Sequence, residues 1–152
     1  MSEKLFDVRG RNALITGASR GIGFALARGL GRAGARPVLN GRNEETLDAA
    51  VAALAKEGIA AKTCAFDVTS HTQASASIAE LEATGTQIDI LINNAGMQTR
   101  APLQDFEVDK FDQLIATNLR SVFSVSQAVA KPMIERKAGK IINIASVMSL
   151  LA

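Results

Sequence analysis

The sequence of 152 residues contains no tyrosine or tryptophan, one histidine and one cysteine. Cys64 cannot form an internal disulfide and no cluster of metal-ligating side chains surrounds it, so we expect no metal site and a reducing compartment. No apolar run approaches the roughly 20 residues of a membrane-spanning helix, and residues 1–10 are polar and mixed in charge. These absences predict a cytoplasmic protein with no signal peptide and no membrane partner.

A concentrated charge of one sign is also missing. The net charge is +2, and the lysines and arginines are scattered along the chain. Nucleic-acid-binding domains carry a basic patch, so no nucleic-acid partner is expected. The length is sufficient for one domain with its own core, and we predict a single domain over residues 1–152.

Apolar residues alternate along the chain between two spacings. Short runs typical of strands occur at Ala13–Ile15, Pro37–Leu39, Ala60–Phe66, Ile88–Ile92 and Lys140–Ile144. Helical spacing fills the segments between them, at Ile22–Ala33, Glu44–Lys56, Ser70–Ala83 and Val108–Glu135. This order predicts an α/β protein with a three-layer, doubly wound parallel sheet, the Rossmann fold. Because that fold normally has a sixth strand, we expect its C-terminal strands to be missing here.

Several residues mark the ends of the expected helices. Asn43 and Ser70 are suited to cap the second and third helices, and Pro132 predicts a kink or a break late in the longest one. Glycines stand just beyond the expected ends of four helices, at Gly34, Gly58, Gly85 and Gly139.

A glycine-rich turn, residues 16–23 with the sequence TGASRGIG, follows the first strand and opens the first helix. Glycines allow close approach of the backbone to a ligand, and a helix N-terminus offers free N–H groups and a positive dipole end to phosphate. An ordinary glycine-rich loop is the alternative, but the strand before it and the helix after it favour a site for a dinucleotide's pyrophosphate. The residues expected to contact this cofactor are Gly17, Ser19, Arg20, Gly21, Ile22 and Gly23.

The T-G-x-x-x-G-x-G spacing of this turn resembles the short-chain dehydrogenase/reductase family rather than the usual G-x-G-x-x-G pattern. Asn93-Asn94-Ala95-Gly96, after the fourth expected strand, resembles the family's second signature. Asn118 and Ser146 fall where the family keeps two of its four catalytic residues. The resemblance runs from about Leu5 to Ala152. It implies an enzyme that moves a hydride between a nicotinamide and a secondary alcohol or ketone.

The same resemblance implies roles for these polar residues. Ser146 would hydrogen-bond the substrate's reacting oxygen, and Asn118 would hold a proton-relaying water. Asn94, Ala95 and Gly96 would lie along the adenosine ribose. The family's proton donor is a tyrosine with a lysine four residues later, and both would follow Ser146 beyond residue 152. Because the sequence has no tyrosine, we expect these 152 residues alone to be inactive.

The end of the second strand bears on the choice of cofactor. A carboxylate there would bond the ribose 2′-hydroxyl, but the family's acidic position matches Gly41, and Arg42 follows. Arg42 and Arg20 offer two guanidinium groups to a 2′-phosphate, which predicts NADP rather than NAD; the alternative is that both are solvated surface charges. Asp67-Val68 resembles the family's adenine-contacting pair, although Asp67 is equally suited to a turn.

Residues after the second signature bear on the substrate. Gln98 and Arg100 leave the fourth strand where open α/β sheets bind ligands, so Gln98 suits a hydroxyl and Arg100 a carboxylate, unless Arg100 is a surface cation. This run resembles the gluconate 5-dehydrogenases of the family, as do Ser126–Val129 and Glu135–Lys140, which implies gluconate and 5-ketogluconate as substrates.

Two alternatives remain open: a 3-oxoacyl or general ketone reductase of the same family, and a non-catalytic nucleotide-binding module. The family pairs subunits along the helix expected at Val108–Glu135, which implies a homodimer or homotetramer.

Overall fold

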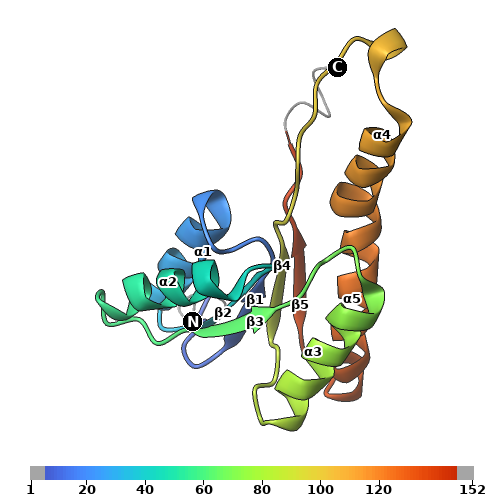
Figure 1. The fold of residues 1–152 in the computed structure, drawn as a ribbon. Coiled ribbons are helices and arrows are strands. Elements are labelled where there is room, and N and C mark those ends of the chain that lie inside the picture. Colours follow the sequence, from blue (N-terminus) through green and yellow to red (C-terminus); the bar gives the residue numbers. More distant parts are fainter. Residues whose placement is uncertain (1–5, 147–152) are drawn as a thin grey trace.

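The computed structural model describes residues 6–146 of the chain. Five parallel strands form one sheet in the order β3-β2-β1-β4-β5 (Figure 1). Each lies within about two residues of a strand expected from the sequence: β1 (Asn12–Ile15), β2 (Arg36–Gly41), β3 (Lys62–Ala65), β4 (Ile90–Asn93) and β5 (Lys140–Asn143). The predicted parallel α/β sheet is therefore confirmed.

Helices cover both faces of this sheet (Figure 1). The helices α1 (Gly21–Arg32) and α2 (Glu44–Ala55) pack on one face. The helices α3 (His71–Ala83) and α5 (Ser121–Glu135) pack on the other face and against each other. A short 3-10 helix, η2 (Leu103–Asp105), and α4 (Val108–Ile115) precede α5, and α4 projects beyond the sheet. The three layers are those of a doubly wound fold.

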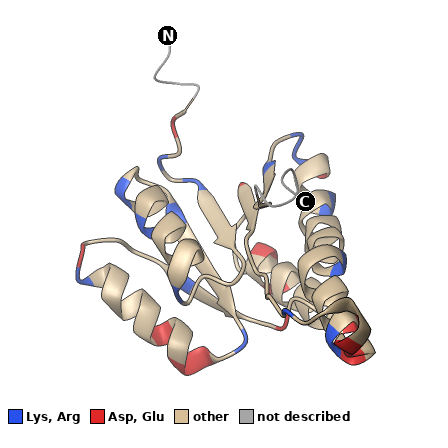
Figure 2. Ribbon diagram, turned by 90° about the horizontal axis from the view of Figure 1, so that it is seen from above, with Lys and Arg blue, Asp and Glu red and all other residues tan. Residues whose placement is uncertain are grey.

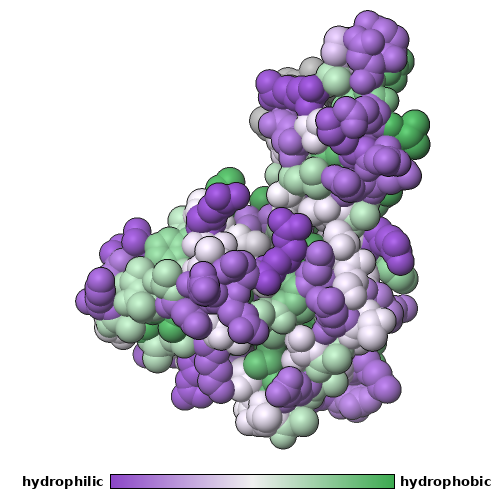
Figure 3. Space-filling model, in the orientation of Figure 1, coloured by the Kyte–Doolittle hydropathy of each residue, from purple (hydrophilic) through white to green (hydrophobic). Residues whose placement is uncertain are grey.

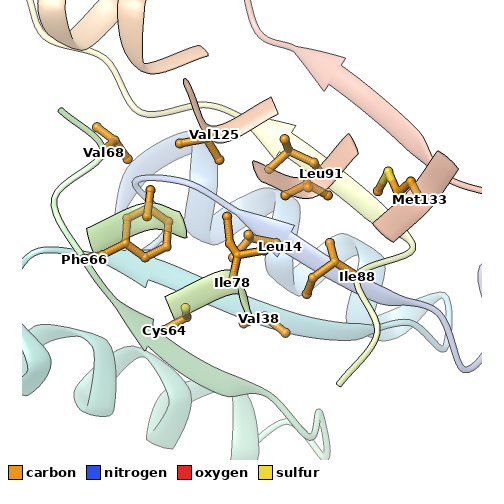
Figure 4. Packing of buried hydrophobic residues seen from close by; sticks show 12 residues of the cluster. Leu14, Val38, Cys64, Phe66, Val68, Ile78, Ile88, Leu91, Val125 and Met133 are labelled. Atoms are coloured by element: carbon orange, nitrogen blue, oxygen red, sulfur yellow. The ribbon is translucent and has the colours of Figure 1, made fainter. Parts of the chain in front are cut away.

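Two apolar cores result from the alternation of side chains along the strands. Ala13 and Ile15 of β1 point to one face and pack with the buried residues of α1 and α2. Leu14, between them, points to the other face and packs with Ile78 of α3 and Val125 of α5 (Figure 4). Ala13, Leu14 and Ile15 are all apolar because β1 is buried on both faces of the sheet.

Both predicted N-caps are present. The Asn43 side chain accepts a hydrogen bond from the Thr46 N–H at 2.9 Å, and that of Ser70 accepts from the Gln73 N–H at 3.3 Å. These bonds satisfy N–H groups that the first turn of a helix leaves without a partner.

The longest helix differs from the prediction of one regular helix over 108–135. A π-helical turn, η3 (Ala116–Arg120), separates α4 from α5, and α5 continues through Pro132 to Glu135, so the helix does not break at the proline. Pro132 has no N–H to donate to the carbonyl four residues earlier, so one hydrogen bond of the helix is missing there. The residue with left-handed backbone after α5 is Lys137, with φ 54°, rather than Gly139. At Gly139 a Cβ would collide with the Met133 side chain.

The described residues, 6–146, contain no helix that is both long and apolar enough to cross a membrane. Over the same range, no three His, Cys, Asp or Glu side chains come together as ligands for a metal ion.

Candidate functional site

The C-terminal ends of the five strands bring the predicted site residues to one edge of the sheet. In a parallel sheet these ends share an edge, and the crevice that takes ligands forms where neighbouring strands lead to opposite faces. Here β1 leads to α1 on one face, and its neighbour β4 leads toward α5 on the other. Seen end-on, the charged residues lie mostly on the surrounding helices and loops, and the strands are largely uncharged (Figure 2).

The glycine-rich turn, residues 16–23, connects β1 to α1 and depends on its glycines. Gly17 and Gly21 have left-handed φ values of 63° and 60°, which a residue with a Cβ rarely adopts. A Cβ on Gly23 would lie only 2.5 Å from the Gly17 carbonyl oxygen and 2.6 Å from the Asn94 amide nitrogen. The turn is therefore folded tightly against the start of the helix.

The first turn of α1 lacks the side-chain cap found on α2 and α3. Arg20 occupies the N-cap position, and its side chain makes no capping hydrogen bond. Backbone N–H groups at this helix terminus remain available to an external acceptor, and the helix dipole favours an anion there. Ile22, two residues later, is 67% exposed although it is large and apolar. A phosphate-bearing ligand with a flat apolar ring matches both features.

Thr16 and Asn94 join the glycine-rich turn to the loop after β4. The Thr16 hydroxyl oxygen accepts hydrogen bonds from the N–H groups of Asn94 and Ala95, each at 2.9 Å. The Asn94 amide donates to the carbonyl oxygens of Thr16, at 2.9 Å, and Gly17, at 3.2 Å. Sequence reasoning placed Asn94 here but gave Thr16 no role of its own, although Thr16 begins the same motif.

Asn93, the first residue of the second signature, has a structural role. Its side chain is buried and donates to the Ser126 hydroxyl and the Asn143 side-chain oxygen, both at 2.9 Å. These bonds tie β4 to α5 and β5. Gly96, which follows the pair Asn94 and Ala95, is exposed at the crevice.

Asn118 lies in the π-helical turn and holds the loop that follows β4. Its side-chain oxygen accepts from the Met97 N–H at 2.8 Å, and its amide donates to the Met97 carbonyl at 2.9 Å. Turns of π-helix interrupt α-helices often at functional sites. The side chain has a positioning task in this structure, and its predicted relay water remains a prediction.

The two cations proposed for a 2′-phosphate, Arg20 and Arg42, are both exposed. Neither side chain forms an ion pair or hydrogen bond with another residue in the range 6–146, so both guanidinium groups are available.

Asp67 accepts hydrogen bonds from the N–H, at 2.9 Å, and the hydroxyl, at 2.8 Å, of Thr69. It therefore forms the turn that the sequence left open as one alternative. The side chain of its neighbour Val68 belongs to the core.

The expected substrate residues lie on exposed loops at the same edge. With its amide turned to satisfy both groups, Gln98 accepts from the Arg100 guanidinium at 3.0 and 3.1 Å. This contact pairs the two residues that the sequence assigned to a sugar acid. Ser146 is exposed, three residues after β5 ends.

The single histidine and the single cysteine take no part in the candidate site. Nδ1 of His71, the single histidine, is 2.9 Å from the Ser124 hydroxyl oxygen, at the contact of α3 with α5. Burial, assisted by the charge of Glu80, raises the pKa of the Cys64 thiol to about 11. Cys64 is thus a neutral core residue at physiological pH.

Two surface hollows of about 520 Å³ each lie elsewhere, one along the outer edge of β3 and the other between α3 and α5. Neither contains any of the residues predicted for the site. The predicted residues gather instead at the C-terminal ends of the strands and in the loops that follow them.

Comparison with known proteins identifies related sequences. The family model described as short chain dehydrogenase matches residues 11–152. Gluconate 5-dehydrogenase of Gluconobacter oxydans is 53% identical over 148 residues, which are 97% of this chain and 58% of that protein. The 5-keto-D-gluconate 5-reductase of Escherichia coli K12 is 46% identical over 147 residues, with the same two coverages. The chain thus spans somewhat less than three fifths of these relatives' length.

Solved structures agree with the fold. A gluconate 5-dehydrogenase from Burkholderia cenocepacia, in complex with NADP and tartrate, superimposes with a TM-score of 0.94 at 53% identity. The superposition includes all of this chain and 60% of that one. A 3-oxoacyl (acyl-carrier-protein) reductase from Agrobacterium tumefaciens with NADP bound has a TM-score of 0.89 at 34% identity, over 99% of this chain and 58% of its own.

Proposed function

The chain belongs to the short-chain dehydrogenase family, and from this premise we propose that the whole protein is an NADP-dependent oxidoreductase acting on a sugar acid. Its substrates are gluconate and 5-ketogluconate, or compounds of that class. Relatives named for this chemistry, at 53% and 46% identity, support the assignment. The activity belongs to the whole protein, because the chain spans 58% of each relative.

The observation that carries the proposal is the uncapped N-terminus of α1 behind the glycine-rich turn. Gly21 leaves open space where a Cβ would stand, and Gly17 and Gly23 let the turn fold tightly against the loop after β4 and the helix. Arg20 leaves the helix terminus without a side-chain cap. A pyrophosphate there would accept from backbone N–H groups of Ser19 to Ile22. The residues present therefore fit a dinucleotide.

The preference for NADP is supported by charge. β2 ends at Gly41 without a carboxylate, and the exposed Arg42 and Arg20 have no partner among residues 6–146. Planar guanidinium groups bind a phosphate dianion through paired hydrogen bonds. Related structures that contain NADP support the same choice.

Chemistry at the site follows from the chain's own groups. NADP, when bound, supplies the carrier for hydride. Ser146 donates a hydroxyl hydrogen bond to the reacting oxygen of the substrate, which stabilises charge that develops there. Asn118 holds the Met97 backbone, and so positions the loop from Met97 to Arg100 that faces the substrate. Arg100, oriented by Gln98, pairs with the carboxylate of the sugar acid.

Titration of the purified chain with NADP and NAD tests the cofactor assignment. We expect NADP to bind more tightly. Arg42→Ala should weaken NADP binding about tenfold, the equivalent of one charge-assisted hydrogen bond, and leave NAD unchanged. Arg36→Ala is the matched control, because Arg36 begins the same strand at the opposite edge of the sheet. An Arg42→Ala variant that bound NADP as tightly as the parent chain does would contradict the assignment.

The substrate assignment is tested with the whole protein and two substrates. Arg100→Ala should raise the KM for 5-ketogluconate about tenfold more than the KM for a neutral ketone, because only the former has a carboxylate. Equal increases would remove the carboxylate role. Faster turnover of an acetoacetyl thioester than of 5-ketogluconate would favour the 3-oxoacyl reductase alternative, and binding of NADP with no turnover by the whole protein would favour the nucleotide-binding module.

An apolar stripe along α4, η3 and the start of α5, which together we call the projecting helix, supports self-association of the protein. Phe111, Ile115, Leu119 and Phe123 recur every four residues, so they lie along one side of the helix, and they are 41–67% exposed. Apolar side chains also interrupt the hydrophilic surface of this projection (Figure 3). Leu119→Lys should convert the homo-oligomer to monomers in light-scattering measurements, whereas Ile134→Lys, near the other end of α5, should not.

A further inference from the structure

Asn40 joins three of the loops that form the candidate site. It lies one residue before the end of β2 and is fully buried. Its side-chain amide donates to the carbonyl oxygens of Cys64, at 3.0 Å, and Phe66, at 3.1 Å. Its backbone carbonyl accepts from the Ala18 N–H of the glycine-rich turn at 2.8 Å. One residue thus connects the chain segments that follow β1, β2 and β3.

The neighbours of Asn40 in sequence and in space are the residues expected to hold the adenosine end of the cofactor. Gly41 and Arg42 come directly after it, at the position expected for a 2′-phosphate. Phe66, whose carbonyl it binds, directly precedes Asp67, at the position expected for adenine. The Gly41 carbonyl also accepts from the Phe66 N–H at 3.1 Å, so β2 and β3 remain paired up to these loops.

Stability alone is a poor explanation for an amide at this position. The three residues before Asn40 in β2 are apolar, and its side-chain oxygen is buried with no hydrogen-bond partner among residues 6–146. A buried polar atom without a partner destabilises the folded state, and it offsets part of what the two donated hydrogen bonds contribute. What those bonds provide for the site is position: they hold the segments that follow β2 and β3 together.

We propose that Asn40 is a positioning residue for NADP, fixing the separation of the Arg42 and Asp67 loops that receive the adenosine 2′-phosphate end. This inference rests on the proposed NADP binding. Asn40 does not touch the cofactor; it acts through the backbone on either side of it. A pre-formed gap between the two loops lowers the entropic cost of ordering them when the ligand binds.

The test compares Asn40→Leu, which keeps the branched shape and removes the donors, with a matched asparagine elsewhere. Asn12 donates to the Gln87 carbonyl at 2.7 Å, and it lies at the start of β1, at the opposite edge of the sheet. Isothermal titration with adenosine 2′,5′-bisphosphate, and separately with NADP, measures the dissociation constants of each folded variant. Thermal unfolding measures stability in parallel.

We expect Asn40→Leu, titrated well below its melting temperature, to bind both ligands about tenfold more weakly than the parent chain. Its melting temperature should fall, because the Cys64 and Phe66 carbonyls lose this donor. Asn12→Leu should bind both as the parent chain does. Asn40→Ser, which keeps one donor, should weaken binding about threefold and serves as the deciding variant if Asn40→Leu does not fold.

Unchanged binding by both Asn40 variants, or an equal loss in Asn12→Leu, would overturn the positioning role while leaving NADP binding intact. If the parent chain itself bound neither the bisphosphate nor NADP, the proposed cofactor would be wrong and this inference would fall with it. The two failures are thus distinguished by the parent chain's own titration.

Discussion

Strands β4 and β5 pair residue for residue and are both rich in isoleucine, yet their surroundings differ. Leu91 and Ile92 of β4 are 0% and 4% exposed, whereas their register partners Ile141 and Ile142 of β5 are 40% and 47% exposed. β4 lies between two strands, and its side chains enter both cores. β5 is at the edge of the described sheet.

The same difference separates two larger regions of the molecule. We call β1, β2, β4 and the glycine-rich turn the closed region, and β5 with the apolar stripe of the projecting helix the open region. Most of the predicted cofactor residues belong to the closed region or to the loops beside it. An apolar pattern in the sequence indicates which side chains favour burial. Whether they are buried depends on neighbouring elements that the pattern does not specify.

The strongest test of the closed region is Gly23→Ala. The added Cβ would collide with the Gly17 carbonyl and the Asn94 amide, so we expect NADP binding to weaken by about a hundredfold or more. Gly29 is the matched control, because it lies in the same helix and a Cβ there would meet nothing within 4 Å. Gly29→Ala should stabilise the chain by up to about 1 kcal/mol and leave binding unchanged. Titration calorimetry measures the binding, and similar affinities for the two variants would show that the turn is not closed.

The register pair Leu91 and Ile141 tests the contrast between the two strands directly. Leu91→Ala creates a cavity in the core and should lower the free energy of unfolding by about 2–5 kcal/mol. Ile141→Ala removes a side chain that is already 40% exposed and should cost about 1 kcal/mol or less. Urea unfolding of both variants gives the difference. Equal losses would mean that β5 is buried in solution.

The closed region could be predicted well from the sequence because its signals are local. The glycine spacing of residues 16–23 and the apolar run of β1 each act within a few residues of their effect, as do the cap residues Asn43 and Ser70 of the neighbouring helices α2 and α3. Parallel pairing then follows from the alternation of strands and helices. These local signals were sufficient to predict that the site residues lie together at the C-terminal ends of the strands.

Features that depend on distant partners could not be read in the same way. The π-helical turn at Asn118 accompanies two bonds to Met97, 21 residues earlier. Asn40 donates to carbonyls 24 and 26 residues away, and nothing adjacent to it in sequence marks it as more than a strand residue. The left-handed backbone after α5 occurs at Lys137, where a glycine would be expected, while Gly139 lies where a Cβ would collide with Met133.

Two ion pairs, one part-buried and one exposed, provide a smaller contrast of the same kind. Arg136 donates to both oxygens of Glu82, one of them at 2.6 Å, and to the Ile88 carbonyl, with side chains 23% and 16% exposed. Lys110 and Glu107 form a pair on α4 that is 47% and 64% exposed. Arg136→Met should cost about 1–3 kcal/mol, since it leaves a part-buried carboxylate without its partner. Lys110→Met should change stability by less than about 0.5 kcal/mol. Urea unfolding that gave equal losses for the two would remove the distinction.

The smallest expected effect belongs to the pair Asp7 and Arg9, which precedes β1 on the surface. Hydrogen bonds from the Arg9 side chain, and then from its backbone N–H, lower the pKa of the Asp7 carboxyl to about 2. Because the folded-state pKa is depressed, any stabilisation is present above the ordinary carboxyl pKa of 3.8 and is lost as pH falls toward 2. Arg9→Gln should return the pKa of Asp7 toward 3.8 in an NMR titration, with no measurable change in the urea midpoint at pH 7. A clear loss of stability at pH 7 would mean that this exposed segment is packed more closely than its surface position indicates. The segment before β1 would then have to be counted with the closed region.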